Sequence, residues 1–210
     1  VGELVLRDRN HPSVAMWSVA NEIYARRGDD NAPDQDWIFA RYAELAGEMK
    51  KLDQTREVSS DGDGDLNGRL PIYSLHYPGA GDPKKPKACT IGESGGMYHM
   101  TPPEVAQWIG DHAYLTSRDR MEALAVQMQD LVPGYRQWAA YATVFNLAWY
   151  GLDPLPMEVQ FRYDDLGTPG VKPERLGPYS TCLNAGRDPK LPAYEPNPLF
   201  TAMKDLYEPI

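Results

Sequence analysis

The chain has 210 residues, of which 42% are hydrophobic and 24% charged, and its formal net charge is −9. This composition is typical of a globular protein of one domain or slightly more. The negative charge argues against nucleic acid as a partner, because a phosphate backbone binds to basic surfaces. No apolar run is long enough for a membrane span, and two cysteines exclude a disulfide framework. These features leave the cellular compartment open.

Five apolar segments have the length of buried strands, and several helical segments lie between them. The run VAMWSVA is apolar on both faces, which favours a parallel sheet covered on both sides. A helix ends near residue 8, and apolar spacings of three and four residues predict an amphipathic helix over 38–52. Further helices are expected over 102–110, 117–131 and 199–207. The expected strands are 14–20, 57–60, 71–77, 88–92 and 142–149.

This order of strands and helices predicts an α/β fold, either a parallel sheet or a barrel. A closed eight-stranded barrel needs eight strands and about 250 residues. The two connections that flank 71–77 are also too short for full crossover helices. We expect a first domain over 1–150 and a proline-rich C-terminal extension over 151–210, packed on the first.

Two glutamates follow apolar strands. Glu22 comes after the first strand and Glu93 after the fourth. Functional residues of parallel α/β folds gather at the carboxyl ends of the strands, so these carboxylates can converge. A carboxylate pair is what glycosidic bond hydrolysis requires, with one acid and one nucleophile or base. The alternative is that each glutamate simply begins a helix, where the macrodipole favours an acidic residue.

The sequences around these glutamates resemble a known family. HPSVAMWSVANE, which ends at Glu22, resembles the acid/base segment of glycoside hydrolase family 2, and TIGESGG, which contains Glu93, resembles its nucleophile segment. VFNLAWYG stands where the eighth barrel strand would be. The resemblance implies an incomplete (β/α)8 TIM barrel with strands four to eight and reduced crossover helices. It also implies a retaining β-glycosidase, with Glu22 as acid/base and Glu93 as nucleophile.

The same resemblance implies roles for further residues, with a carbohydrate as the ligand and no cofactor or metal. Asn21 matches the residue that donates to the sugar 2-hydroxyl. Trp149 matches an aromatic platform on which a sugar ring stacks, and the alternative is that it packs in the core. His76 and Tyr77 end the sixth strand, where relatives place a residue that hydrogen-bonds the nucleophile. The alternative is that His76 and Tyr77 have no catalytic role and simply cap the end of the strand with a half-buried aromatic ring.

Independently of the resemblance, the loop after the fifth strand opens on the expected catalytic face, where Asp61 or Asp63 would contact a sugar hydroxyl. The alternative is an acidic loop whose glycines and aspartates serve turn geometry.

Three alternatives remain open from the sequence. A partial barrel is expected to bind carbohydrate without turnover, or to need a complementary segment or self-association, because its edge strands are unpaired. GESGG also matches the nucleophile elbow of serine esterases, with Ser94 as nucleophile, but no histidine follows His112 to complete it. DGDGDLNG resembles the start of a calcium loop, but it lacks the glycine and glutamate that such a loop needs.

Overall fold

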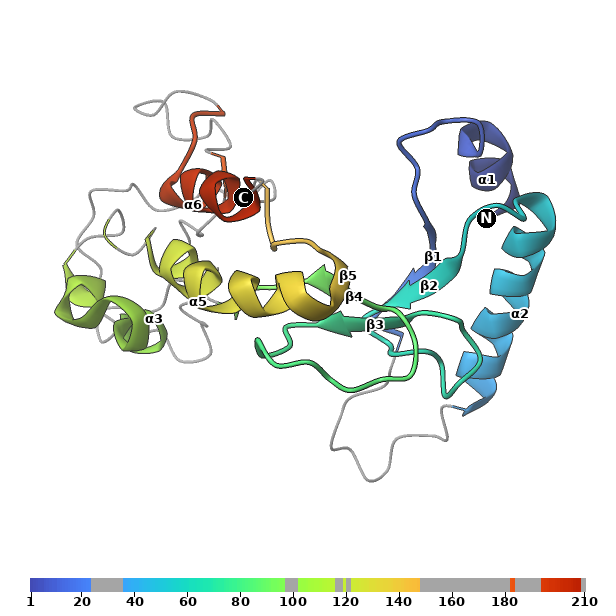
Figure 1. The fold of residues 1–210 in the computed structure, drawn as a ribbon, viewed down its shortest axis with the longest axis horizontal. Helices are drawn as coiled ribbons and strands as arrows, with labels where there is room; N and C mark the ends of the chain where they lie inside the picture. Colours follow the sequence, from blue (N-terminus) through green and yellow to red (C-terminus); the bar gives the residue numbers. More distant parts are fainter. Residues whose placement is uncertain are drawn as a thin grey trace, which may run out of the picture. The chain divides into compact units, whose positions relative to one another are not determined.

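The computed structural model describes residues 1–23, 36–96, 102–115, 119, 122–147, 182–183 and 194–208. Parallel strands alternate with helices along these segments (Figure 1). In chain order the elements are α1 (Gly2–Asp8), β1 (Trp17–Asn21), α2 (Asp36–Leu52), β2 (Val58–Asp61), β3 (Tyr73–His76), β4 (Cys89–Glu93), α3 (Pro102–Ile109), the 3₁₀ helix η2 (Gly110–Tyr114), α5 (Ala123–Trp138), β5 (Ala139–Ala142) and α6 (Pro198–Tyr207).

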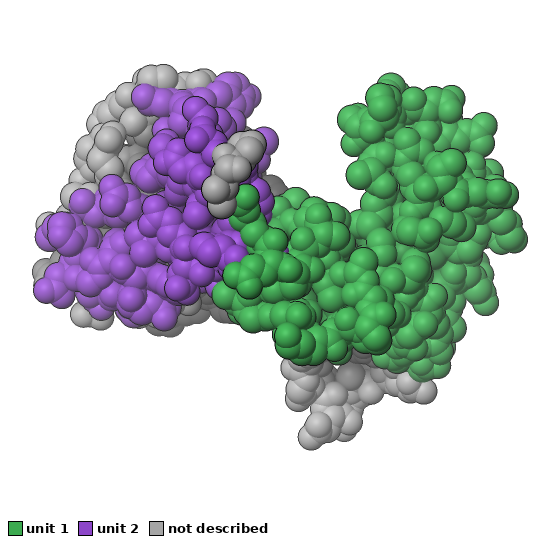
Figure 2. All heavy atoms as spheres, viewed as in Figure 1, with its two compact units in different colours: residues 1–94, 136–143 green, residues 95–135, 144–210 purple. Residues whose placement is uncertain are grey.

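The chain divides into two compact units (Figure 2). Unit 1 comprises residues 1–94 and 136–143, and unit 2 comprises residues 95–135 and 144–210. The predicted boundary at residue 150 stays a prediction, because most of the segment 151–210 lies outside the described residues. In the described part of the chain, no helix is long and apolar enough to cross a membrane.

The strands of unit 1 are parallel, as expected. β1 pairs with β2, and β3, β4 and β5 form a second sheet in that order. Residues 62–72 and 77–88 contain no helix, which confirms that the connections flanking β3 are reduced to loops. The α/β class is therefore confirmed. The described strands form two open sheets without closing into a barrel, and the incompleteness of the barrel stays a prediction.

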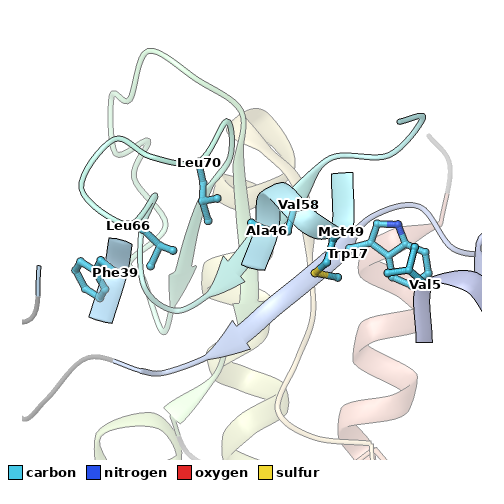
Figure 3. Packing of buried hydrophobic residues seen from close by; sticks show 8 residues of the cluster. All are labelled: Val5, Trp17, Phe39, Ala46, Met49, Val58, Leu66 and Leu70. Atoms are coloured by element: carbon cyan, nitrogen blue, oxygen red, sulfur yellow. The ribbon is translucent and has the colours of Figure 1, made fainter. Parts of the chain in front are cut away.

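One hydrophobic core cluster of unit 1 contains side chains from α1, α2, β1 and β2 (Figure 3). α2 forms as predicted, and it buries Phe39, Ala46 and Met49. Trp17 and Val58 supply the facing side chains from β1 and β2. Alternation along β1 places Trp17 and Val19 on this core. The opposite face of β1 is therefore free for polar residues.

A hydrogen-bond network fixes the segment that leads into β1. Arg56 donates to the main-chain carbonyls of Arg9, His11 and Val14. Its guanidinium also pairs with Asp53 at 2.8 Å, and Asp53 accepts a hydrogen bond from Trp17 Nε1 at 3.0 Å. His11 therefore lies in the segment before β1, where its main-chain carbonyl accepts a hydrogen bond from Arg56.

α5 confirms the predicted helix over residues 123–131 and extends beyond it, whereas the strand predicted over 142–149 is displaced. α5 runs through Pro133 to Trp138, because Val132 and Tyr135 are buried and packing outweighs the proline. β5 then begins at once, with Ala139 opposite Cys89 and Ala142 opposite Ile91. The strand expected over 142–149 is thus wrong for the described residues 143–147, which follow β5 as an irregular segment.

Unit 2 contains the remaining helices. α3 covers Pro102–Ile109, close to the predicted bounds, and Val105 packs with Ala113 and Ala123 in a small buried cluster. α6 confirms the predicted C-terminal helix and buries Leu199 and Ala202. The proline-rich tail falls mostly outside the described residues, so its predicted extended conformation stays a prediction.

Candidate active site

Three strand ends of unit 1 bring polar side chains together. Glu22 directly follows β1, His76 and Tyr77 lie at the end of β3, and Glu93 closes β4. A carboxylate oxygen of Glu22, a ring nitrogen of His76 and a carboxylate oxygen of Glu93 all lie within 4.8 Å of one another. The two glutamates singled out in the sequence therefore converge, because parallel strands present their carboxyl ends at one edge.

The imidazole of His76 lies between the two carboxylates, but it does not contact them equally. His76 Nδ1 is 2.7 Å from Glu22 Oε1 and 3.8 Å from Glu93 Oε2. Only the shorter distance is a hydrogen bond. The sequence-based expectation placed His76 on the nucleophile, whereas the structure joins it to the proposed acid/base.

Tyr77 is the residue that contacts Glu93. Its phenolic hydroxyl donates to Glu93 Oε2 at 2.5 Å, and its main-chain N–H donates to the Glu93 carbonyl at 2.8 Å. A hydroxyl-to-carboxylate hydrogen bond of this length is charge-assisted and among the stronger kinds in proteins. The carboxylate of Glu93 is therefore held in one orientation by its neighbour on β3.

Both Glu22 and Tyr77 have left-handed backbone conformations. Their φ angles are 51° and 48°, a region that residues other than glycine adopt rarely and at a cost in energy. The Glu22 N–H donates to the Asp61 carbonyl at 2.9 Å, so β2 holds the turn in place. Such conformations turn the side chain away from the direction that a continued strand would give it, and they cluster at functional sites.

Burial divides the cluster into an accessible part and an inaccessible part. The side chains of Glu22 and Glu93 are 38% and 20% exposed, whereas that of His76 is 4% exposed. The carboxylates can therefore meet a ligand, and the imidazole lies beneath them. The three residues also carry atom types that bind divalent cations. In the structure His76 Nδ1 is hydrogen-bonded to Glu22 and the Tyr77 hydroxyl to Glu93, so both carboxylates already have protein partners.

Asn21 and Asp61 lie opposite each other at the ends of β1 and β2. Asn21 is exposed, and the carboxylate of Asp61 accepts a hydrogen bond from Ser74 Oγ at 3.1 Å. Both lie next to the carboxylate pair, although their predicted contacts with sugar hydroxyls stay predictions.

The other aspartates of the loop DGDGDLNG have separate protein partners. Asp63 is buried and accepts a hydrogen bond from Ser60 Oγ at 2.7 Å, and Asp65 forms an ion pair with Lys87 at 2.6 Å. Among the described residues the loop forms no cluster of three potential metal ligands, which agrees with the turn that its glycines and aspartates favour.

Tyr141 is a residue of the site region that the sequence analysis missed. It lies on β5, where burial and the neighbouring Asp61 carboxylate raise the pKa of its phenol. The assignment of the eighth strand to 142–149 left Tyr141 outside the expected sheet. Trp149, which the sequence suggested as a platform at that strand end, lies outside the described residues.

Ser94 is placed unfavourably for an esterase. The residue is fully buried, and its hydroxyl donates to the main-chain carbonyl of Thr143 at 2.6 Å. A nucleophile elbow exposes its serine at the top of the sheet, beside a basic histidine. The structure does not favour chemistry through Ser94.

The family resemblance is confirmed over the segment that carries this site. Residues 1–98 match the family model described as glycosyl hydrolases family 2, TIM barrel domain. This range includes Glu22, His76, Tyr77 and Glu93.

Curated relatives are similar over shorter ranges. The chain is 26% identical to the beta-galactosidase BoGH2A of Bacteroides ovatus over 110 residues. These aligned residues make up 52% of this chain and 12% of that protein. It is 37% identical over 59 residues to a beta-glucuronidase of Paenibacillus borealis, covering 28% of this chain and 9% of the relative. Over 22 residues it is 82% identical to the beta-glucuronidase of Canis lupus familiaris, covering 10% and 3%. The chain thus spans about an eighth of these relatives or less.

Proposed function

We propose, from the match of residues 1–98 to the barrel domain of family 2 glycosyl hydrolases, that the chain carries the catalytic centre of a retaining β-glycosidase. The observation that carries the proposal is the approach of the Glu22 and Glu93 carboxylates to within 4.8 Å, oxygen to oxygen. Retaining enzymes hold their two carboxyl groups about 5 to 5.5 Å apart, whereas inverting enzymes leave about 6.5 to 9.5 Å for a water molecule. The short approach supports retention.

In the proposed mechanism, Glu93 is the nucleophile. Its carboxylate attacks the anomeric carbon while the bond from that carbon to the leaving oxygen breaks, and Glu22 gives its proton to this oxygen. The covalent glycosyl ester on Glu93 is then attacked by water, and Glu22 takes the proton from that water. The hydrogen bond from Tyr77 orients Glu93 for the first attack and stabilises the carboxylate that leaves in the second.

The substrate class follows from the relatives and from the residues around the pair. The relatives are named beta-galactosidase and beta-glucuronidase, so we propose a carbohydrate with a β-linked hexose or hexuronic acid. Asn21 and Asp61 would bind sugar hydroxyls, and Trp149 would stack on the ring. The proposed chemistry uses only carboxylates and water, with no cofactor or metal.

Hydrolysis of aryl β-galactosides and β-glucuronides tests this proposal. Glu22→Gln and Glu93→Gln should each lower turnover by orders of magnitude, because each removes one partner of the double displacement. Glu57→Gln is the matched control, since Glu57 lies before β2 and its side chain is 52% exposed beside Lys50. Normal hydrolysis by either active-site variant would contradict the assignment.

Azide distinguishes the two glutamates. Added azide should partly restore turnover of an activated β-glycoside by Glu93→Ala, because the anion fits the vacated space and attacks the anomeric carbon. Ser94→Ala should keep most activity on glycosides. A Ser94→Ala variant that loses activity on esters, beside an unaffected Glu93→Ala variant, would overturn the glycosidase proposal.

A further inference from the structure

We propose that His76 is the positioning residue of the acid/base Glu22, and that it hydrogen-bonds neither the sugar nor the nucleophile. Its Nδ1–H holds Glu22 Oε1, which leaves Oε2 as the oxygen that carries the proton to the leaving group. This inference rests on the proposed function for the role of Glu22. It goes beyond that function by assigning one neighbour to each carboxylate.

The distances support a division of tasks between two adjacent residues of one strand end. His76 Nδ1 is 2.7 Å from Glu22 Oε1, within hydrogen-bond range, and 3.8 Å from Glu93 Oε2, outside it. Tyr77 already donates to Glu93 Oε2 at 2.5 Å. At the end of β3, His76 is thus hydrogen-bonded to the acid/base Glu22 and Tyr77 to the nucleophile Glu93.

Two glycines leave the space in which the imidazole lies. A Cβ atom on Gly62 would lie 2.8 Å from His76 Nδ1, and a Cβ atom on Gly92 would lie 2.8 Å from Nε2. Any other residue at either position would collide with the ring. Because its side chain is also only 4% exposed, the imidazole has little freedom to turn away from Glu22. Such fixed geometry is what a positioning residue requires.

The hydrogen bond defines which nitrogen of the ring acts. The carboxyl oxygen Oε1 accepts a hydrogen bond whether or not Oε2 carries the catalytic proton, so Nδ1 is the nitrogen that donates to it. Nε2 is buried and has no protein partner among the described residues. The other titratable groups near the ring are Glu93 on β4, Asp61 on β2, and the phenol of Tyr77. Of these groups, the structure joins only Glu22 to the ring by a hydrogen bond.

Leaving-group dependence tests the assignment. Substrates with a poor leaving group need the proton from Glu22, whereas a dinitrophenolate departs without it. His76→Leu should therefore lower kcat/KM about 100-fold for an alkyl β-glycoside, the order expected from a misplaced catalytic group, and leave the dinitrophenyl β-glycoside nearly unchanged. kcat/KM is the right quantity, because it excludes the later step in which Glu22 acts as a base.

Two further variants sharpen the comparison. His76→Asn keeps an N–H donor near the position of Nδ1 and should recover most of the loss. Tyr77→Phe, which acts on the nucleophile, should lower kcat/KM for both substrates alike. The assignment is overturned if His76→Leu affects both substrates equally, or if His76→Asn is no better than His76→Leu.

A measurement without substrate separates failure of this inference from failure of the proposed function. In the ¹⁵N NMR spectrum of the histidine-labelled chain, His76 Nδ1 should carry the proton. Glu22→Gln should shift its resonance more than Glu93→Gln does. If hydrolysis is absent but these shifts are seen, the proposed function fails and the hydrogen-bond assignment stands. An unprotonated Nδ1, or a larger shift in Glu93→Gln, overturns the inference itself.

Discussion

Replacing Tyr77 by phenylalanine removes one hydroxyl group from the site. That hydroxyl donates to Glu93 Oε2 at 2.5 Å, and the ring itself is 38% exposed, so the substitution leaves packing almost unchanged. A hydrogen bond to a charged group contributes about 1.5 to 3 kcal/mol. Each 1.36 kcal/mol of barrier is a factor of about ten in rate. We therefore expect kcat/KM to fall about 10- to 150-fold in Tyr77→Phe.

The assay is initial-rate hydrolysis of aryl β-glycosides with good and poor leaving groups. Because the hydroxyl acts on the nucleophile, the loss should be similar across the series. Tyr73→Phe is the matched control, since Tyr73 lies on the same strand and its ring packs under Lys85 instead of in the site. A loss equal to that of Tyr73→Phe, or a loss confined to poor leaving groups, would refute the reasoning.

Further predictions concern stability, packing and assembly. Hydrogen bonds, of which the one from Thr55 has the largest effect, hold the pKa of Asp53 well below its usual range. The ionised Asp53 therefore stabilises the fold above the ordinary carboxyl pKa, and this stabilisation is lost as the pH falls from that value through the lowered pKa. Asp53→Asn should lower Tm at neutral pH and weaken the acid dependence of Tm. Met49→Ala, at a residue 1% exposed, should cost about 2 to 5 kcal/mol in denaturant unfolding. Gly92→Ala should lower hydrolysis of alkyl β-glycosides, because its Cβ would lie 2.8 Å from His76 Nε2, whereas Gly79→Ala, whose Cβ meets nothing within 4 Å, should not. Among the described strands β1 pairs on one side only, so we expect self-association or a bound complementary segment, and a dispersed monomer in light scattering at high concentration would contradict this.

The elements that the sequence predicted correctly are those with a local signal. Two-sided apolar runs mark β1 and β4, and Glu22 follows β1 whereas Glu93 ends β4, so both strand ends were accessible to sequence reasoning. α2 was predicted because its apolar spacing is a property of one segment.

What the sequence did not predict depends on contacts between distant segments. β5 is short and lies where Ala139 and Ala142 pair with β4, so the more apolar run after it was a misleading signal. The hydrogen bond of His76 to Glu22 depends on the left-handed turn at Glu22 and on the space beside Gly62 and Gly92. Neither feature can be inferred from β3 alone.

Trapping of the covalent intermediate tests the central claim most directly. A 2-deoxy-2-fluoro β-glycoside with a dinitrophenyl leaving group, in galactosyl and glucuronyl forms, slows the release of a glycosyl ester more than its formation. Peptide mass spectrometry should then find one sugar on Glu93, and none in a Glu93→Gln variant. A label on Ser94 or another residue, or no label with either reagent, would contradict the claim that Glu93 is the nucleophile of a retaining glycosidase.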